Sequence, residues 1–202
     1  DATIKVNASP VASSQFMVFN WNKASDPFKQ SLFRSDKFRR AMSHLVNRQA
    51  VIDIVYGGLG TPMYSSVYPV LTQWINPKVP KYEYDPKQAA KLLAELGFTK
   101  KDREGYLVDS KGRRIEFNLA TNAGNTQREQ IAKLIVDEAK KVGVKVNFQA
   151  IDFNTLVGQL LSSGPDRPFD AIIIGLTGGG LDWPFGSNVV PCKGNLHMWN
   201  KS

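Results

Sequence analysis

The stretch FDAIIIG at residues 169–175 decides the fold, because it is an almost uninterrupted apolar run of strand length. Such runs are typical of central strands that are covered on both faces. Before it come a strand at 115–119, a helix from about Thr126 to Gly143, a strand at 144–149 and a helix that Asp152 can cap. This β-α-β-α-β series predicts right-handed crossovers and a largely parallel sheet.

Upstream of this series, the pattern predicts a strand, three helices and a hairpin. The strand is the aromatic and β-branched run at 15–21, and a polar loop with Pro27 follows it. Helices are expected around 38–45, from Asn47 to the glycines at 57–58, and from the Asp85-Pro86 cap to Gly97. The hairpin would pair 105–108 with 115–119 across a turn at 109–112. In the helix that Asp152 caps, the residues expected to be buried are Phe153, Leu156, Val157 and Leu160.

Two long segments lack a regular period. Residues 63–84 hold three prolines and scattered aromatic residues, and a loop of this length inside a domain is typical of a binding or covering role. Residues 176–202 are rich in glycine and have neither a helical nor an alternating pattern. Six aromatic residues outside the helical stripes either stack on a ligand or, more commonly, anchor loops: Trp21, Tyr64, Tyr68, Trp74, Trp183 and Trp199.

Composition narrows the class of protein without naming a chemistry. The 202 residues include 26 Lys+Arg and 18 Asp+Glu, a net charge of +8, but no basic run that indicates a nucleic-acid partner. No apolar stretch approaches the length of a membrane span. The first residues lack the features of a signal peptide, which leaves a cytoplasmic protein or one whose leader has been removed. The single Cys192 excludes an intrachain disulfide.

Sequence patterns for catalysis, metals and phosphate are weak. His197 follows Cys192 by five residues and His44 stands alone on a predicted helix, so no metal site and no cofactor is expected. The chain has no Gly-x-Ser-x-Gly motif for a nucleophile, and nothing in it argues for an enzyme. The glycines at 178–180 are followed by Leu181 and Asp182, which fits neither a Walker loop nor a dinucleotide loop.

The candidate binding site is the loop that follows the FDAIIIG strand. Ligands of open α/β sheets bind outside the carboxyl ends of the strands, and this loop leaves the most buried one. Its glycines permit close approach, Asp182 offers a charge and Trp183 a stacking face. The alternative is a turn whose glycines only permit unusual dihedral angles. The substrate-binding residues expected here are Thr177, Gly178, Gly179, Asp182 and Trp183.

Several segments together resemble family 5 extracellular solute-binding proteins, the oligopeptide- and dipeptide-binding receptors of ABC importers. Residues 38–52, FRRAMSHLVNRQAVI, resemble the family's F-R-x-A signature with its [DN]-R pair. GLGTP at 58–62 and YDPKQAAKLLAELGF at 84–98 follow in the family's order. Phe19-Asn20 and the end of the helix at 141–144 also match. The resemblance covers nearly the whole chain.

The resemblance implies a periplasmic-binding-protein-like α/β lobe with a mixed, mostly parallel sheet flanked by helices. Residues 1–22 would be hinge-proximal strands, and 23–202 the carboxy-terminal lobe of a longer two-lobed chain whose amino-terminal lobe is missing here. Asp182 matches the position at which peptide receptors hold the ligand's amino terminus. The residues 177–179 and 194–200 depart from the peptide receptors, so a non-peptide solute such as an oligosaccharide stays open.

The implied function is capture of peptides or a similar small solute and its delivery to a membrane permease, without catalysis and without a nucleic-acid partner. The implied location is the periplasm or the cell exterior, with the full-length protein anchored as a lipoprotein. The alternative is the ligand-sensing lobe of a regulatory protein.

Overall fold

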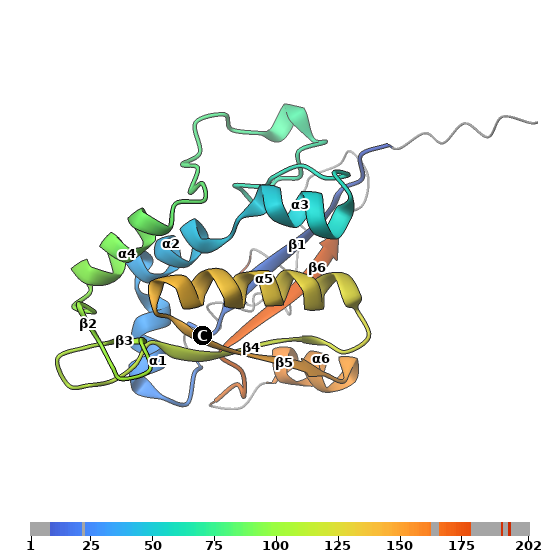
Figure 1. The fold of residues 1–202 in the computed structure, drawn as a ribbon. Coiled ribbons are helices and arrows are strands. Elements are labelled where there is room, and N and C mark those ends of the chain that lie inside the picture. The colour runs from blue at the N-terminus through green and yellow to red at the C-terminus, as the bar shows by residue number, and fades with distance from the viewer. Residues whose placement is uncertain (1–8, 22, 163–165, 179–190, 192–193, 195–202) are drawn as a thin grey trace, which may run out of the picture.

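The computed structural model describes residues 9–21, 23–162, 166–178, 191 and 194 of the chain. It is a mixed α/β lobe in which the predicted β-α-β-α-β series is present as β4 to β6 (Figure 1). In chain order the elements are β1 Ser13–Phe19, α1 Pro27–Arg34, α2 Asp36–Leu45, α3 Arg48–Tyr56, the short 3-10 helix η1 Thr72–Trp74, α4 Pro86–Glu95, β2 Lys100–Lys101, β3 Leu107–Val108, β4 Glu116–Asn122, α5 Thr126–Val142, β5 Lys145–Ile151, α6 Phe153–Leu161 and β6 Ala171–Thr177.

The main sheet has the strand order β1-β6-β4-β5, so β6 lies in its interior. β4 runs parallel to both β5 and β6, and only β1 runs antiparallel to its neighbour. The expectation of a mixed, mostly parallel sheet is confirmed. So is the central position of the FDAIIIG strand, because Ala171, Ile172, Ile173 and Ile174 are all buried.

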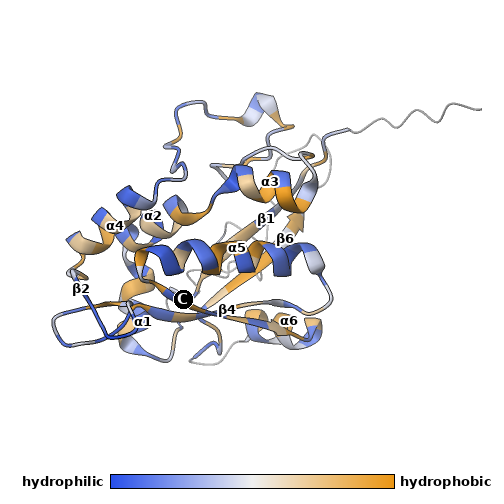
Figure 2. Ribbon diagram, in the orientation of Figure 1, coloured by the Kyte–Doolittle hydropathy of each residue, from blue (hydrophilic) through white to orange (hydrophobic). Residues whose placement is uncertain are grey.

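Helices cover the sheet on both faces, and β6 contributes to both. Ile173 packs into the larger hydrophobic core beneath α1, α2, α4 and α5. Ile172 and Ile174 point to the opposite face, where they pack with Leu156 and Leu160 of α6. Figure 2 shows the apolar residues along β6, with many polar residues on the outer helices α4 and α5.

Four phenylalanine rings form the centre of the larger core. Phe19 of β1, Phe33 of α1, Phe38 of α2 and Phe117 of β4 contact one another, with ring centroids 5.2 to 6.2 Å apart. Such tilted and edge-to-face pairs stabilise beyond the burial of their area. These rings join the first strand and the first two helices to the centre of the sheet.

Three helix starts agree with the sequence. The side chains of Asn47, Asp85 and Asp152 accept hydrogen bonds from the first backbone N–H groups of α3, α4 and α6. One prediction was wrong at the segment around Pro27, which was expected to be a loop. Asp26 caps α1 there and Pro27 occupies its first turn, where proline lacks a donor that the helix does not need.

Two further expectations need correction. The predicted hairpin is reduced to a single bridge between Val108 and Arg114, because β3 pairs with β2 while β4 enters the main sheet. Phe153 was expected to be buried, but it is 51% exposed. It is the first residue of α6, directly after the cap, and it stays exposed although its spacing places it on the same helix face as Leu156 and Leu160.

The phenylalanine cluster leads to a stability prediction. Phe38 is fully buried among the other three rings, so we expect Phe38→Ala to lower the free energy of unfolding by about 3–5 kcal/mol. The matched control is Phe153→Ala at the exposed start of α6, which should cost less than about 1 kcal/mol. Urea denaturation followed by circular dichroism measures both. Equal losses in the two variants would contradict this arrangement of the core.

Candidate functional site

The carboxyl ends of the parallel strands β4 and β6 lie at the same edge of the sheet, where β1 begins. We call this the carboxyl edge. Thr177 and Gly178 lie there as expected: the Thr177 hydroxyl is 3.5 Å from that of Ser13, and the Gly178 N–H donates to the Ala12 carbonyl at 2.7 Å. The other predicted site residues, Gly179, Asp182 and Trp183, lie outside the described residues, and the binding role of all five residues stays a prediction.

Arg128 supplies a positive charge at this edge that sequence reasoning missed. It stands in the first turn of α5, which Asn125 caps through the Arg128 N–H. Its Nε donates to the Gln15 side-chain oxygen at 2.8 Å, and its Nη1 donates to that of Asn122 at 2.7 Å. Burial lowers the pKa of the guanidinium, which nevertheless stays charged. Within the described part of the chain, no carboxylate forms an ion pair with it.

Gly175 makes room for this arrangement. A Cβ atom at this position would lie 2.7 Å from both polar atoms of the Gln15 amide and 2.8 Å from Nη2 of Arg128. Real Cβ atoms do not come so close, so glycine at residue 175 lets the ends of the Gln15 and Arg128 side chains lie directly over the backbone of β6, and a larger residue would make these flexible ends shift. Gly175 therefore permits a close approach of side chains at this strand end.

The long loop between α3 and α4, residues 57–85, reaches the same edge, and we call it the strap. Arg48 holds both of its ends: its Nε donates to the Met63 carbonyl at 3.1 Å and its Nη1 to the Tyr82 carbonyl at 3.0 Å. Tyr68, only 7% exposed, donates from its hydroxyl to the Leu176 carbonyl of β6 at 3.3 Å. The expected ordered loop is present, with η1 as its one regular element among the described residues.

The aromatic residues of the described segments anchor structure in the way the commoner interpretation expects. Arg39 lies 3.7 Å above the Trp21 ring and Arg48 lies 4.9 Å from the Tyr64 ring. Tyr68 is buried against the end of β6, whereas Trp74 is 43% exposed. The remaining two, Trp183 and Trp199, lie outside the described residues.

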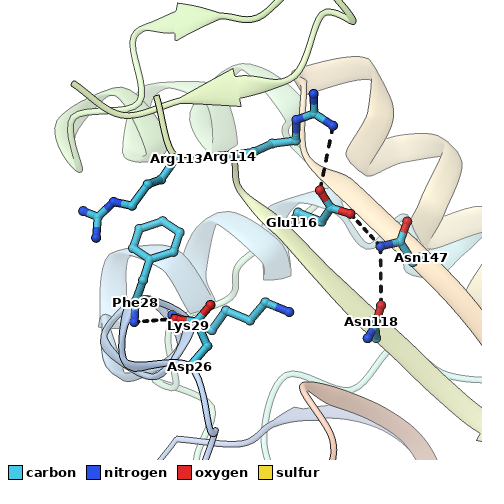
Figure 3. A pocket seen from close by; sticks show the side chains of 8 residues that line it. All are labelled: Asp26, Phe28, Lys29, Arg113, Arg114, Glu116, Asn118 and Asn147. Atoms are coloured by element: carbon cyan, nitrogen blue, oxygen red, sulfur yellow. Dashed lines mark hydrogen bonds and ion pairs between the residues drawn. The ribbon is translucent and has the colours of Figure 1, made fainter. Parts of the chain in front are cut away.

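A hollow of about 750 Å³ opens at the opposite edge of the sheet, where β4 begins (Figure 3). Its walls are polar, but its charges already have partners: Lys29 pairs with Asp170 at 2.7 Å, and Glu116 accepts from Asn147 at 2.9 Å. Burial opposes ionisation of Glu116, yet its hydrogen bonds from Asn147 and Lys145 keep the pKa below its ordinary value. We interpret the hollow as a structural ion-pair network. Its lining residues are Asp26, Phe28, Lys29, Arg113, Arg114, Glu116, Asn118 and Asn147.

The histidine and cysteine residues considered for metal binding are not gathered at a described site. The Nδ1 of His44 lies 2.6 Å from the Glu83 carbonyl, which ties α2 to the strap. His197 and Cys192 lie outside the described residues. In the part of the chain that the structure describes, no group of three or more potential ligands is placed to hold a metal ion, and no helix is long and apolar enough to cross a membrane.

A buried parallel core with polar groups gathered at its carboxyl edge defines an α/β lobe of the ligand-binding class. Residues 1–194 match the profile described as bacterial extracellular solute-binding proteins, family 5 middle. The chain therefore belongs to the family 5 extracellular solute-binding proteins, as the resemblance implied.

Relatives agree with this assignment. A probable ABC transporter-binding protein of Deinococcus radiodurans is 54% identical over 99% of this chain and 35% of its own length. The oligopeptide-binding protein AppA of Bacillus subtilis is 34% identical over 79% of this chain and 28% of its own. The structure of AppA with a nonapeptide matches 87% of this chain and 32% of its own, with a TM-score of 0.71 and 31% identity. The chain thus spans about a third of the length of these relatives.

The contacts of Arg48 lead to a prediction about the strap. Lysine offers one point of charge in place of a planar fork, so Arg48→Lys cannot hold Met63 and Tyr82 together. We expect the free energy of unfolding to fall by about 1–3 kcal/mol and proteolytic cleavage within residues 57–85 to become faster. Limited proteolysis with mass spectrometry measures the cleavage sites.

The control for this experiment is Arg113→Lys between β3 and β4, where Arg113 forms a partly exposed pair with Asp109 of the same turn. This variant should be cleaved at the wild-type rate. Cleavage of Arg48→Lys at the wild-type rate would show that Arg48 does not hold the strap.

Proposed function

We propose that this chain is the carboxy-terminal lobe of a two-lobed receptor that captures peptides or a similar small solute and delivers it to a membrane ABC permease. Residues 23–202 would form the lobe and residues 1–22 the strands near the hinge. The family, the names of the relatives and the polar carboxyl edge support this function. The relatives named are binding proteins, and we propose no catalysis for this chain.

The observation that carries the proposal is the guanidinium of Arg128. It is held against β6 by two neutral amide oxygens, at the edge where ligands of open sheets bind. Neutral partners orient the guanidinium without cancelling its charge. An anionic group of the solute, such as the terminal carboxylate of a peptide, would supply the missing counter-charge through charge-assisted hydrogen bonds.

The expected role of Asp182 complements this charge. As in the peptide receptors that the sequence resembles, we propose that Asp182 binds the solute's amino terminus, with Trp183 as a stacking surface and the backbone at 177–179 within reach of the solute. A carboxylate and a guanidinium that serve the same solute suit one that carries both charges.

Closure between two lobes would complete the site. In hinge-closing receptors each lobe supplies part of the contacts, so one lobe by itself should bind weakly. The missing amino-terminal lobe is therefore a proposed partner, together with the permease. We propose a periplasmic or extracellular location with a lipid anchor on the full-length protein.

Two alternatives differ from this proposal: the first in the domains that the gene encodes beside this lobe, the second in the solute. A sensor would carry a helix-turn-helix or signalling domain beside this lobe, whereas an importer receptor would carry a leader with a lipid-attachment site. A non-peptide solute such as an oligosaccharide has no charged ends, so its binding would not depend on Arg128.

The role of Arg128 is tested in the full-length protein that the gene encodes. Peptides of five and nine residues are screened by isothermal titration calorimetry, and the tightest is then compared with its carboxyl-amidated form. We expect Arg128→Gln to weaken binding of the free-acid peptide about 10- to 100-fold. This change in affinity corresponds to the free energy of one hydrogen-bonded contact with a charged group. The amidated peptide should bind the wild type and the variant equally weakly.

The matched control is Arg113→Gln, which removes an arginine from the hollow at the opposite edge. It should leave the affinity for both peptides unchanged. Equal affinity of the wild type for the acid and the amide would contradict the role of Arg128, and failure of all peptides would contradict the proposed solute class.

A further inference from the structure

Tyr68 of the strap packs against Gly178 at the end of β6, a residue without a side chain. The ring of Tyr68 lies where a side chain at Gly178 would be: a Cβ atom there would lie 2.6 Å from Cε2, 3.3 Å from Cδ2 and 3.4 Å from Cζ. The first of these separations is closer than Cβ atoms approach other groups, so the ring and a side chain at residue 178 exclude each other.

Neither side of this contact is free to move away. Gly178 is tied to the start of the chain by its hydrogen bond to Ala12, and the Tyr68 hydroxyl is bonded to Leu176, two residues earlier on the same strand end. Tyr68 is buried, and its own carbonyl accepts from the Leu71 N–H in the strap. The ring therefore has little room to turn aside.

The contact links two distant parts of the lobe. Arg48, at the start of α3, holds the ends of the strap, and the strap in turn brings Tyr68 to β6, 108 residues further along the chain. Directly after Gly178 comes the segment with Gly179, Asp182 and Trp183, the residues proposed to bind the solute. The direction in which the chain leaves Gly178 decides where that segment begins.

We propose that Tyr68 is a positioning residue of the solute site: its ring packs on the bare backbone of Gly178 and fixes the path by which the chain leaves β6. This inference rests on the proposed function. Tyr68 need not touch the solute, because it acts through the backbone of residues 176–178. The strap thereby supports the backbone at Gly178, from which the proposed binding loop starts.

The test uses the full-length protein and the pentapeptide or nonapeptide selected in the Arg128 screen. Gly178→Ala should weaken peptide binding about tenfold, because the added methyl group pushes the chain away from the ring. Adding Tyr68→Leu removes the Cε2 atom that the methyl group would strike, so the double variant should bind more tightly than Gly178→Ala alone. Tyr68→Phe keeps the ring and loses only one hydrogen bond, so its affinity should fall by no more than about threefold.

Gly158→Ala in α6 is the matched control, since a Cβ atom there meets no other group within 4 Å. It should bind like the wild type. Recovery of the peptide affinity in the double variant is the result expected from positioning. If Gly178→Ala acted only by lowering the stability of the lobe, a second substitution at the buried Tyr68 would lower the stability further.

Two outcomes overturn the inference while leaving the proposed function intact. One is wild-type affinity in Gly178→Ala, and the other is a double variant that binds no better than Gly178→Ala. If the wild type itself binds none of the peptides, the proposed function fails and the inference fails with it.

Discussion

Burial of β6 on both faces is the constraint on which the rest of this lobe depends. An interior strand must present apolar side chains in both directions, and Ile172 and Ile173 do so toward opposite helix layers. The strand therefore cannot carry polar binding groups along its length. Polar chemistry is confined to its end, where Gly175 admits the guanidinium of Arg128 and Gly178 admits the Tyr68 ring. A rigid apolar strand thus positions the groups at its tip.

The family signature of this chain has a structural rather than a ligand-binding explanation. Phe38 completes the aromatic cluster, and Arg48 bonds the strap carbonyls of Met63 and Tyr82. Asn20, the asparagine of the Phe-Asn pair, is buried and donates to the carbonyls of Arg167 and Phe169 just before β6. Arg48 and Asn20 thus give hydrogen-bond donors to backbone carbonyls that lie outside the regular helices and strands. They hold the strap and β6 in the positions that a site at the carboxyl edge requires.

Local signals made most of the fold predictable, whereas the missed features depended on long-range contacts or on local signals with two meanings. Helix caps such as Asp85 act within a few residues, so the sequence displays them directly. The strap was recognised only by its length. Arg128 was missed because one of its partners, Gln15, is 113 residues away, so no local pattern shows that contact. A useful signal was available, since Arg128 lies in the first turn of the helix that follows a strand end in a parallel series. The short α1 was missed because Asp26 and Pro27 also suit a turn.

The two edges of the sheet show how similar residues acquire different roles. At the edge where β4 begins, Lys29 pairs with Asp170, and Arg114 lies among Asp102, Glu104 and Glu116, so both of these cations have carboxylate partners. Such pairs contribute little beyond local order when they are partly exposed. At the carboxyl edge Arg128 has amide partners, which hold its geometry but leave its field unopposed by any described carboxylate. Since the attraction between charges grows as water is excluded, an anion of the proposed solute enclosed beside this guanidinium would interact with it more strongly than in open water. A cation with carboxylate neighbours thus has a structural role, whereas a cation with amide neighbours is suited to binding an anion.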